Sequence, residues 1–287
     1  MRKTSLVSDR ILMFLIYLSG IFTVALLIGI IVYVAVRGIG VIDWTFISTV
    51  QSAAKGTFGI LGYLVNTLYI IILTLIIAVP IGIGAAIYLN EYAKRGKLVS
   101  LIETTTEVLS GIPSIIYGLF GMVFFGNTLH MGFSVICGSL TLTLMILPII
   151  IRTTQESLKT VPDSYRQGAL GMGASKWHII RTIILPSSLS GIVTAVILAI
   201  GRITGESAAL LFTAGSGYLL PKLADWGIFR HIGETGGSLV VGMYLNMSEG
   251  NIDNAFGMAL ILLIIVLLIN MLTKVASSKL NRSGGTQ

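Results

Sequence analysis

Long apolar runs alternate with short polar segments along the whole chain. Such runs occupy residues 11–36, 61–89, 187–214 and 255–272. A helix needs about 20 residues to cross roughly 30 Å of hydrocarbon, and these runs are of that order. We therefore expect one membrane span in each of them.

A further stretch, between Glu107 and Arg152, contains no Asp, Glu, Lys or Arg. It is long enough for two spans, and the polar break at 127–132, with His130 and Gly132, fits the turn between them. The pattern predicts an all-α membrane protein with six transmembrane helices.

The composition agrees with a lipid environment. The chain is 54% hydrophobic and 11% charged, whereas soluble domains average about 25% charged residues. A net charge of +7 is compatible with nucleic-acid binding, but the basic residues lie in short clusters between apolar runs, so we expect no nucleic-acid partner. The single cysteine, Cys137, cannot form a disulfide or a zinc site within this chain.

The distribution of Lys and Arg predicts the orientation, because cytoplasmic loops carry an excess of both. We place both termini in the cytoplasm, with tails at 1–10 and 278–287 and a retained first span at 11–36, in the cytoplasmic (inner) membrane. The side that faces the cytoplasm then carries Arg2, Lys3, Arg10, Lys94, Arg95, Lys97, Arg152, Lys159, Arg166, Lys176, Arg181, Lys274, Lys279 and Arg282. The opposite side carries Arg37, Lys55, Lys222 and Arg230.

The polar segment 153–186, between the fourth and fifth spans, is longer than a hairpin needs. A short helix is predicted to begin at Asp163, with Asp163 as its cap, and to end at Gly171. Gly173 then separates it from a second amphipathic helix, whose apolar face would carry Trp177, Ile180 and Ile184. Amphipathic helices of this kind either rest on lipid or dock on a partner.

This segment resembles the cytoplasmic signature of ABC importer permeases, the binding-protein-dependent (MetI-like) superfamily. The signature is Glu-Ala-Ala, three residues, Gly, nine residues, then Ile-x-Leu-Pro. The matching positions here are Gln167, Gly168, Ala169, Gly173, Ile183, Leu185 and Pro186. Gln167 and Gly168 depart from it, where the signature has Glu and Ala. The resemblance implies a coupling helix that docks on a separate ATP-hydrolysing subunit and transmits its closure to the spans.

Two more stretches narrow the resemblance. Residues 110–121 resemble the third-span signature of phosphate-importer permeases, and residues 201–214 resemble their fifth-span signature, most of all that of the PstA type. The likeness covers a permease core at 61–277. It implies three partners: a second, PstC-like permease, a PstB-like ATPase dimer that binds the ATP, and a PstS-like phosphate-binding protein. It implies no cofactor in this chain. The glycine-rich outer loop 215–253 would contact that binding protein or serve as a solvated connector.

Two charges interrupt the predicted fifth span. Arg202 and Glu206 are four residues apart and would share one helix face. Because a charge at mid-bilayer costs about 2.5–3.5 kcal/mol even on the lenient scale, each needs a partner. Either the two neutralise each other, or Arg202 meets a transported anion, for which its planar donors suit phosphate. Thr204 and Ser207 would add hydroxyl donors there, unless they bond to their own helix backbone.

The sequence contains no phosphate-binding loop, since the only Gly-Lys pair, Gly96-Lys97, is followed by Leu98. We therefore expect a transport subunit rather than an enzyme, with ATP hydrolysis in another chain. The alternatives are a permease for sulfate, molybdate or phosphonate, an anion channel, or a secondary transporter. The helix–Gly–helix segment favours an ATP-driven importer. His130 and His178 lack partners at metal-binding spacing, and no metal site is expected.

Overall fold

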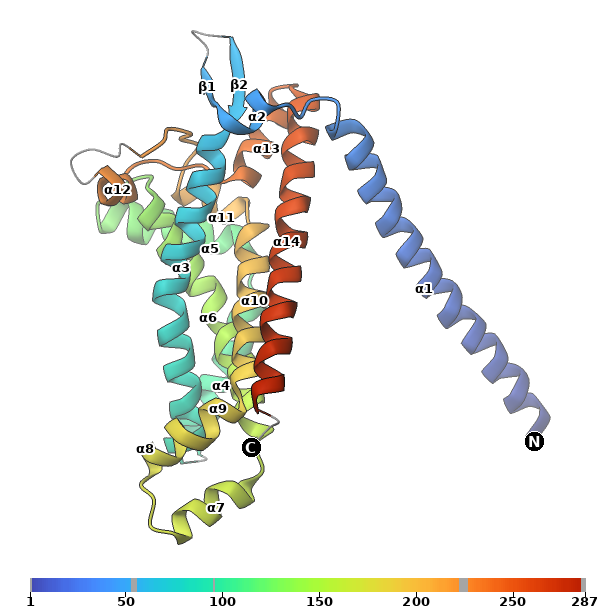
Figure 1. Ribbon diagram of the computed structural model, residues 1–287, viewed down its shortest axis with the longest axis vertical. Coiled ribbons are helices and arrows are strands. Elements are labelled where there is room, and N and C mark those ends of the chain that lie inside the picture. The colour runs from blue at the N-terminus through green and yellow to red at the C-terminus, as the bar shows by residue number, and fades with distance from the viewer. Residues whose placement is uncertain (1, 53–55, 95, 222–226, 285–287) are drawn as a thin grey trace.

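The computed structural model describes residues 2–52, 56–94, 96–221 and 227–284. Its helices form an elongated bundle (Figure 1). Within these residues, four helices are long and apolar enough to cross a membrane, and two bent helix pairs bring the number to six if each pair is one span. The predicted all-α membrane fold is confirmed.

Helix α1 (Arg2–Gly38) leaves the bundle at an angle and meets it only near its C-terminal end (Figure 1). There a Cβ on Gly38 would lie 2.6 Å from the carbonyl oxygen of Phe256 in α14 (Ile252–Gly284). The start of α1 and the end of α14 lie at the same end of the bundle, which we call the terminal end (Figure 1). The shared end agrees with a chain that crosses the membrane an even number of times.

The opposite end carries the one addition to an all-helical fold that the described residues show. Strands β1 (Val50–Ser52) and β2 (Thr57–Ile60) pair antiparallel after the short helix α2 (Trp44–Ser48). We call this the hairpin end. Asp43 caps α2 by accepting a hydrogen bond from the backbone N–H of Phe46 at 2.6 Å. This bond and one from the Thr45 hydroxyl hold the pKa of Asp43 below its usual value.

The centre of the bundle is the contact between α3 (Leu61–Ile87) and α6 (Val135–Lys159), with α10 (Leu189–Thr204) against both. In lipid, close packing rather than water exclusion holds helices together, so small residues matter at such contacts. A Cβ on Gly82 of α3 would lie 2.6 Å from Cγ2 of Ile150 in α6, and a larger residue would push the two helices apart.

The part of the chain predicted to hold the third span is not one straight helix. It begins as α4 (Lys97–Ser110), bends by 100°, and continues as α5 (Ser114–Gly121) and the π-helical turn η3 (Met122–Thr128). The bend falls at Gly111–Pro113, because proline disfavours helical geometry in the residue before it. The predicted turn after it is confirmed: His130 and Gly132 have φ of 55° and 58°, and Ser134 then caps α6.

The segment 215–253 is not the loop that we predicted. It contains α12 (Gly227–Arg230), the 3₁₀ turn η5 (His231–Gly233) and α13 (Leu239–Ser248). Leu239 and Val241 of α13 are fully buried, and so is His231, whose Nε2 lies 2.7 Å from Oδ1 of Asn66 in α3. The buried residues of segment 215–253 pack against the bundle at the hairpin end. Lys222 and Asp225, predicted to lie in the loop, are outside the described residues.

At the terminal end, α3 is prolonged by the π-helical turn η2 (Tyr88–Tyr92). The polar segment after α6 folds beneath it as α7 (Asp163–Gly171), α8 (Lys176–Ile179), the π-helical turn η4 (Ile180–Ile184) and α9 (Leu185–Ser187). Figure 1 shows α7 and α8 as the outermost part of this end. A 67° bend then leads into α10.

Candidate coupling segment and substrate path

Helix α7, the first helix of the candidate coupling segment, begins where the sequence predicts, but with a different cap. Pro162 occupies the cap position of α7, and Asp163 is the first helical residue. The Asp163 carboxylate instead accepts a hydrogen bond from Nη1 of Arg166 at 3.0 Å. The prediction that Asp163 caps the helix is therefore wrong, because Pro162 takes the cap position and Asp163 is already helical.

The turn between α7 and α8 depends on Gly173. Its φ of +84° is in the left-handed region, which side chains with a Cβ rarely adopt. Its N–H donates to the carbonyl of Leu170 at 2.9 Å, as at many helix ends. No described atom lies within 4 Å of a Cβ built on Gly173, so conformation rather than space demands glycine there. The predicted helix–Gly–helix geometry is confirmed.

The buried face of the second helix differs from the prediction. Ile179, Ile180 and Ile184 are buried, whereas Trp177 is 59% exposed. Ile179 and Ile180 are neighbours on the helix, and the face that they share with Ile184 leaves Trp177 to one side. Together with Ala86, Leu158, Val161 and Ala169, these isoleucines form an apolar cluster that packs α7 and α8 against α3 and α6.

The other signature positions spread over this segment. Gln167 and Gly168 are exposed on α7, Ile183 and Leu185 are half-buried, and Pro186 lies in α9. Four large apolar side chains of the segment are exposed: Tyr165, Leu170, Met172 and Trp177. Exposed apolar side chains gathered on one segment are typical of a surface that meets a partner.

Arg202 and Glu206 do not share a helix. Helix α10 ends at Thr204. Oε1 of Glu206 accepts a hydrogen bond from the backbone N–H of Ala209, in the first turn of α11 (Ala208–Thr213). No ion pair joins Arg202 to Glu206 in the part of the chain that the structure describes. The predicted common face is wrong because α10 ends at Thr204, before Glu206, and α11 begins only at Ala208.

The Arg202 side chain lies on the open side of α10. Thr194 and Leu198, on the same face of α10, are exposed as well, and no described atom lies within 4 Å of a Cβ built on Gly201. A charge on an open face of a span needs water, a solute or another subunit beside it.

The two hydroxyl residues near Arg202 differ in availability. Thr204 is buried, and its Oγ1 donates to the carbonyl of Ile200 at 2.7 Å, the back-bond expected of a helical threonine. Ser207 is half-buried in the break between α10 and α11. Of the two, Ser207 is the hydroxyl that is better placed to meet a solute.

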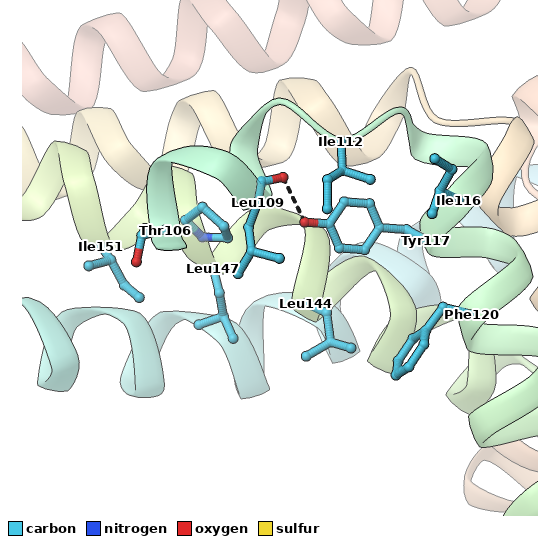
Figure 2. Close-up of a pocket in the computed structure, with 10 residues that line it drawn as sticks. Thr106, Leu109, Ile112, Ile116, Tyr117, Phe120, Leu144, Leu147 and Ile151 are labelled. Atoms are coloured by element: carbon cyan, nitrogen blue, oxygen red, sulfur yellow. Dashed lines mark hydrogen bonds between the residues drawn. The ribbon is translucent and has the colours of Figure 1, made fainter. Parts of the chain in front are cut away.

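A cavity of about 420 Å³ lies between α4, α5 and α6 (Figure 2). Its lining is almost wholly apolar, with Leu109, Ile112, Phe120 and Leu144 around the Tyr117 ring. The one hydrogen bond drawn across it runs from the Tyr117 hydroxyl to the carbonyl of Leu109, at 2.8 Å (Figure 2). The cavity offers no charge to an anion, so we do not count it as part of the substrate path.

No group of three or more His, Cys, Asp or Glu that suits a metal ion occurs among the described residues.

The sequence matches the profile of a known family over residues 78–283, described as "Binding-protein-dependent transport system inner membrane component".

Named relatives agree with that match. The chain is 36% identical over 223 residues to a probable ABC transporter permease protein, YqgI, of Bacillus subtilis, covering 78% of this chain and 76% of the relative. It is 33% identical over 219 residues to the phosphate transport system permease protein PstA of Haemophilus influenzae, covering 76% of each.

Solved structures share the fold. A chain of a bacterial alginate ABC transporter, solved with a pentasaccharide-bound periplasmic protein, superposes with a TM-score of 0.69 at 16% identity, over 94% of this chain and 95% of that chain. A chain of the inward-facing MetNI methionine ABC transporter gives 0.59 at 20% identity, over 77% and 94%. The helical spans and the sequence match agree: the chain belongs to the inner-membrane permeases of binding-protein-dependent ABC transport systems.

Proposed function

We propose that this chain is a membrane subunit of an ATP-driven importer of inorganic phosphate. Its partners would be a second permease subunit, an ATPase dimer and an extracytoplasmic phosphate-binding protein. The observation that carries the proposal is the guanidinium of Arg202 on the open side of a broken span, with no ion pair to any residue that the structure describes, in a chain with relatives named as phosphate permeases. A guanidinium presents planar, paired donors that match the oxygens of phosphate.

The direction of transport follows from the two ends of the bundle. The coupling segment α7–α8 and both chain ends share the terminal end, which we assign to the cytoplasm because of its excess of Lys and Arg (Figure 1). The hairpin end would then face the binding protein. Phosphate enters there, passes Arg202 near the break between α10 and α11, and leaves at the terminal end.

The coupling segment supplies the ATP dependence. Its exposed apolar side chains, with Met172 85% and Trp177 59% exposed, offer a docking surface to an ATPase. Closure of the ATPase dimer on ATP would push the turn at Gly173 and open the spans toward the hairpin end. Hydrolysis would return them and release phosphate to the cytoplasm. The stiff attachment of α7 and α8 through their buried cluster supports this transmission.

A permease for another tetrahedral oxyanion is the second candidate. The Arg202 donors suit sulfate or molybdate as well as phosphate, and charge alone does not distinguish these anions. Phosphate ranks first because relatives at 33–43% identity carry that name.

Uptake in cells distinguishes the two candidates. A strain that lacks this chain, with or without it restored from a plasmid, is given radiolabelled phosphate at low concentration. We expect restored uptake that excess unlabelled phosphate abolishes, and that sulfate, molybdate and phosphonates leave unchanged. If one of those anions competes as well as phosphate, the substrate assignment is wrong while the permease assignment stands.

A further inference from the structure

Arg166 of α7 joins three segments of the chain at the terminal end. Its Nη2 donates to Oε1 of Glu91 in η2 at 2.9 Å and to the carbonyl of Leu158 in α6 at 2.9 Å. Its Nη1 donates to the carbonyl of Val161 at 2.7 Å and to Asp163 at 3.0 Å. Its Nε completes the contact to Glu91 at 3.3 Å. All five N–H groups of the guanidinium therefore have acceptors.

The Arg166–Glu91 pair is largely withdrawn from solvent. The side chain of Glu91 is 6% exposed and that of Arg166 is 17% exposed. Oε1 of Glu91 also accepts a hydrogen bond from the side-chain amide of its neighbour Asn90, at 2.7 Å. Such a pair contrasts with the ion pairs of Arg152 with Glu107 and Glu156, whose side chains are all more than half exposed.

Stability alone gives little reason for this pair. Removing two charges from water costs about as much as their attraction returns, and apolar residues of similar volume often stabilise a fold equally well. A guanidinium whose N–H groups all have acceptors also fixes orientation. Because the group is planar, it sets the angle between the residues to which it donates hydrogen bonds. Here those groups belong to the coupling helix and to the ends of α3 and α6, the two helices at the centre of the bundle.

We propose that Arg166 and Glu91 form the joint through which movement of the coupling segment reaches α3 and α6. Arg166 is then a positioning residue for ATP-driven transport, and Glu91 is its anchor on α3. The proposal rests on the assignment of α7 and α8 as the ATPase contact. The apolar cluster holds the segment in place, while the pair keeps α7 at a fixed angle to both spans. Lys176 of α8, 5.2 Å above the Tyr92 ring, adds a weaker tie between the same parts.

The test uses the whole transporter, purified through a tag on this chain and reconstituted in vesicles. The variants are Arg166→Gln, Arg166→Lys and Glu91→Gln, and the matched control is Arg152→Gln, which breaks the exposed pairs. Three quantities are measured: the ATPase subunit that co-purifies, the rate of ATP hydrolysis, and the phosphate taken up per ATP hydrolysed.

We expect Arg166→Gln and Glu91→Gln to retain the ATPase subunit and to hydrolyse ATP, while phosphate uptake per ATP falls by about tenfold. For Arg166→Lys, which keeps the positive charge but not the planar set of donors, we expect uptake per ATP between that of these two variants and that of the wild type. Arg152→Gln stays within about twofold of the wild type, because exposed pairs contribute little. A purely structural role would lower assembly and leave uptake per ATP unchanged in the complexes that form.

The proposal is overturned if Glu91→Gln takes up as much phosphate per ATP hydrolysed as the wild type. It is also overturned if the variants lose the bound ATPase subunit to the same extent as they lose uptake. Glu91→Gln is nearly isosteric and decides the matter if Arg166→Gln fails to insert. Failure of the wild-type chain to co-purify with any ATPase is a different result, since it contradicts the proposed function itself.

Discussion

Oε1 of Glu206 accepts a hydrogen bond from the backbone N–H of Ala209 at 3.1 Å. The bond satisfies one of the free N–H groups at the start of α11 and holds a carboxylate at the positive end of that helix. Glu206 therefore has a partner that does not depend on Arg202. The guanidinium of Arg202, four residues earlier, lies on the exposed side of α10.

This cap predicts how two substitutions at Glu206 differ. Glu206→Gln keeps an oxygen that accepts the Ala209 N–H, whereas Glu206→Ala leaves the N–H bare. We expect Glu206→Ala to lower the free energy of unfolding by about 1 kcal/mol and Glu206→Gln to change it much less. Thermal unfolding of the detergent-purified protein measures both. Equal losses in the two variants would show that the carboxylate does not act as a cap.

The role of Arg202 is tested by removing its charge alone and together with that of Glu206. We predict that Arg202→Gln abolishes phosphate uptake, because no other charge is available in the break to attract an anion, and that ATP hydrolysis continues. The double variant Arg202→Gln with Glu206→Gln stays inactive as well. Phosphate uptake measured in cells distinguishes an anion-binding Arg202 from one that only neutralises Glu206. Recovery of uptake in the double variant would show that the two residues only neutralise each other.

At Gly173 the prediction concerns backbone conformation. Valine at a φ of +84° is strained by about 1–2 kcal/mol or more, whereas asparagine tolerates the left-handed region. We expect Gly173→Val to insert normally but to uncouple ATP hydrolysis from uptake, and Gly173→Asn to keep much of the coupling. The ratio of phosphate taken up to ATP hydrolysed is the measurement. Normal co-purification and uptake in Gly173→Val would contradict the coupling assignment.

The orientation is tested with single cysteines. Cys137 is buried and free, so Cys137→Ser gives a background that thiol reagents do not label. In this background Ser248→Cys, exposed at the hairpin end, should react with a membrane-impermeant reagent in intact cells. Asp9→Cys, exposed near the start of α1, should react only after the membrane is opened. The reverse pattern would place the termini outside.

The parts of the fold that the sequence predicts are those set by local chemistry. Apolar run length predicts the spans, and the left-handed turn at Gly173 follows from a glycine between two amphipathic pieces. The predictions that were wrong, on the Arg202–Glu206 face and on the face of the second amphipathic helix, also depend on local features. The spacing of apolar residues does not reveal those features. A three-residue gap that contains Glu206 separates α10 from α11, and the buried face of the second helix centres on Ile179 and Ile180 rather than on Trp177.

The Arg166–Glu91 contact lies beyond sequence reasoning for a different reason. The two residues are 75 positions apart, and each reads as an ordinary charge at the border of a span. Only the packing of α7 beneath α3 and α6 brings them together. The segment 215–253 is similar, since its glycines suggest a loop, and its buried residues Leu239 and Val241 find their partners only in the folded bundle.

The most direct test of the account is ATP-driven transport by the purified assembly. Vesicles that contain this chain with its co-purifying subunits receive radiolabelled phosphate on the binding protein at the hairpin end and ATP at the terminal end. The account predicts phosphate accumulation inside that requires ATP, the binding protein and Arg202. Accumulation without ATP, or of sulfate in place of phosphate, would contradict it.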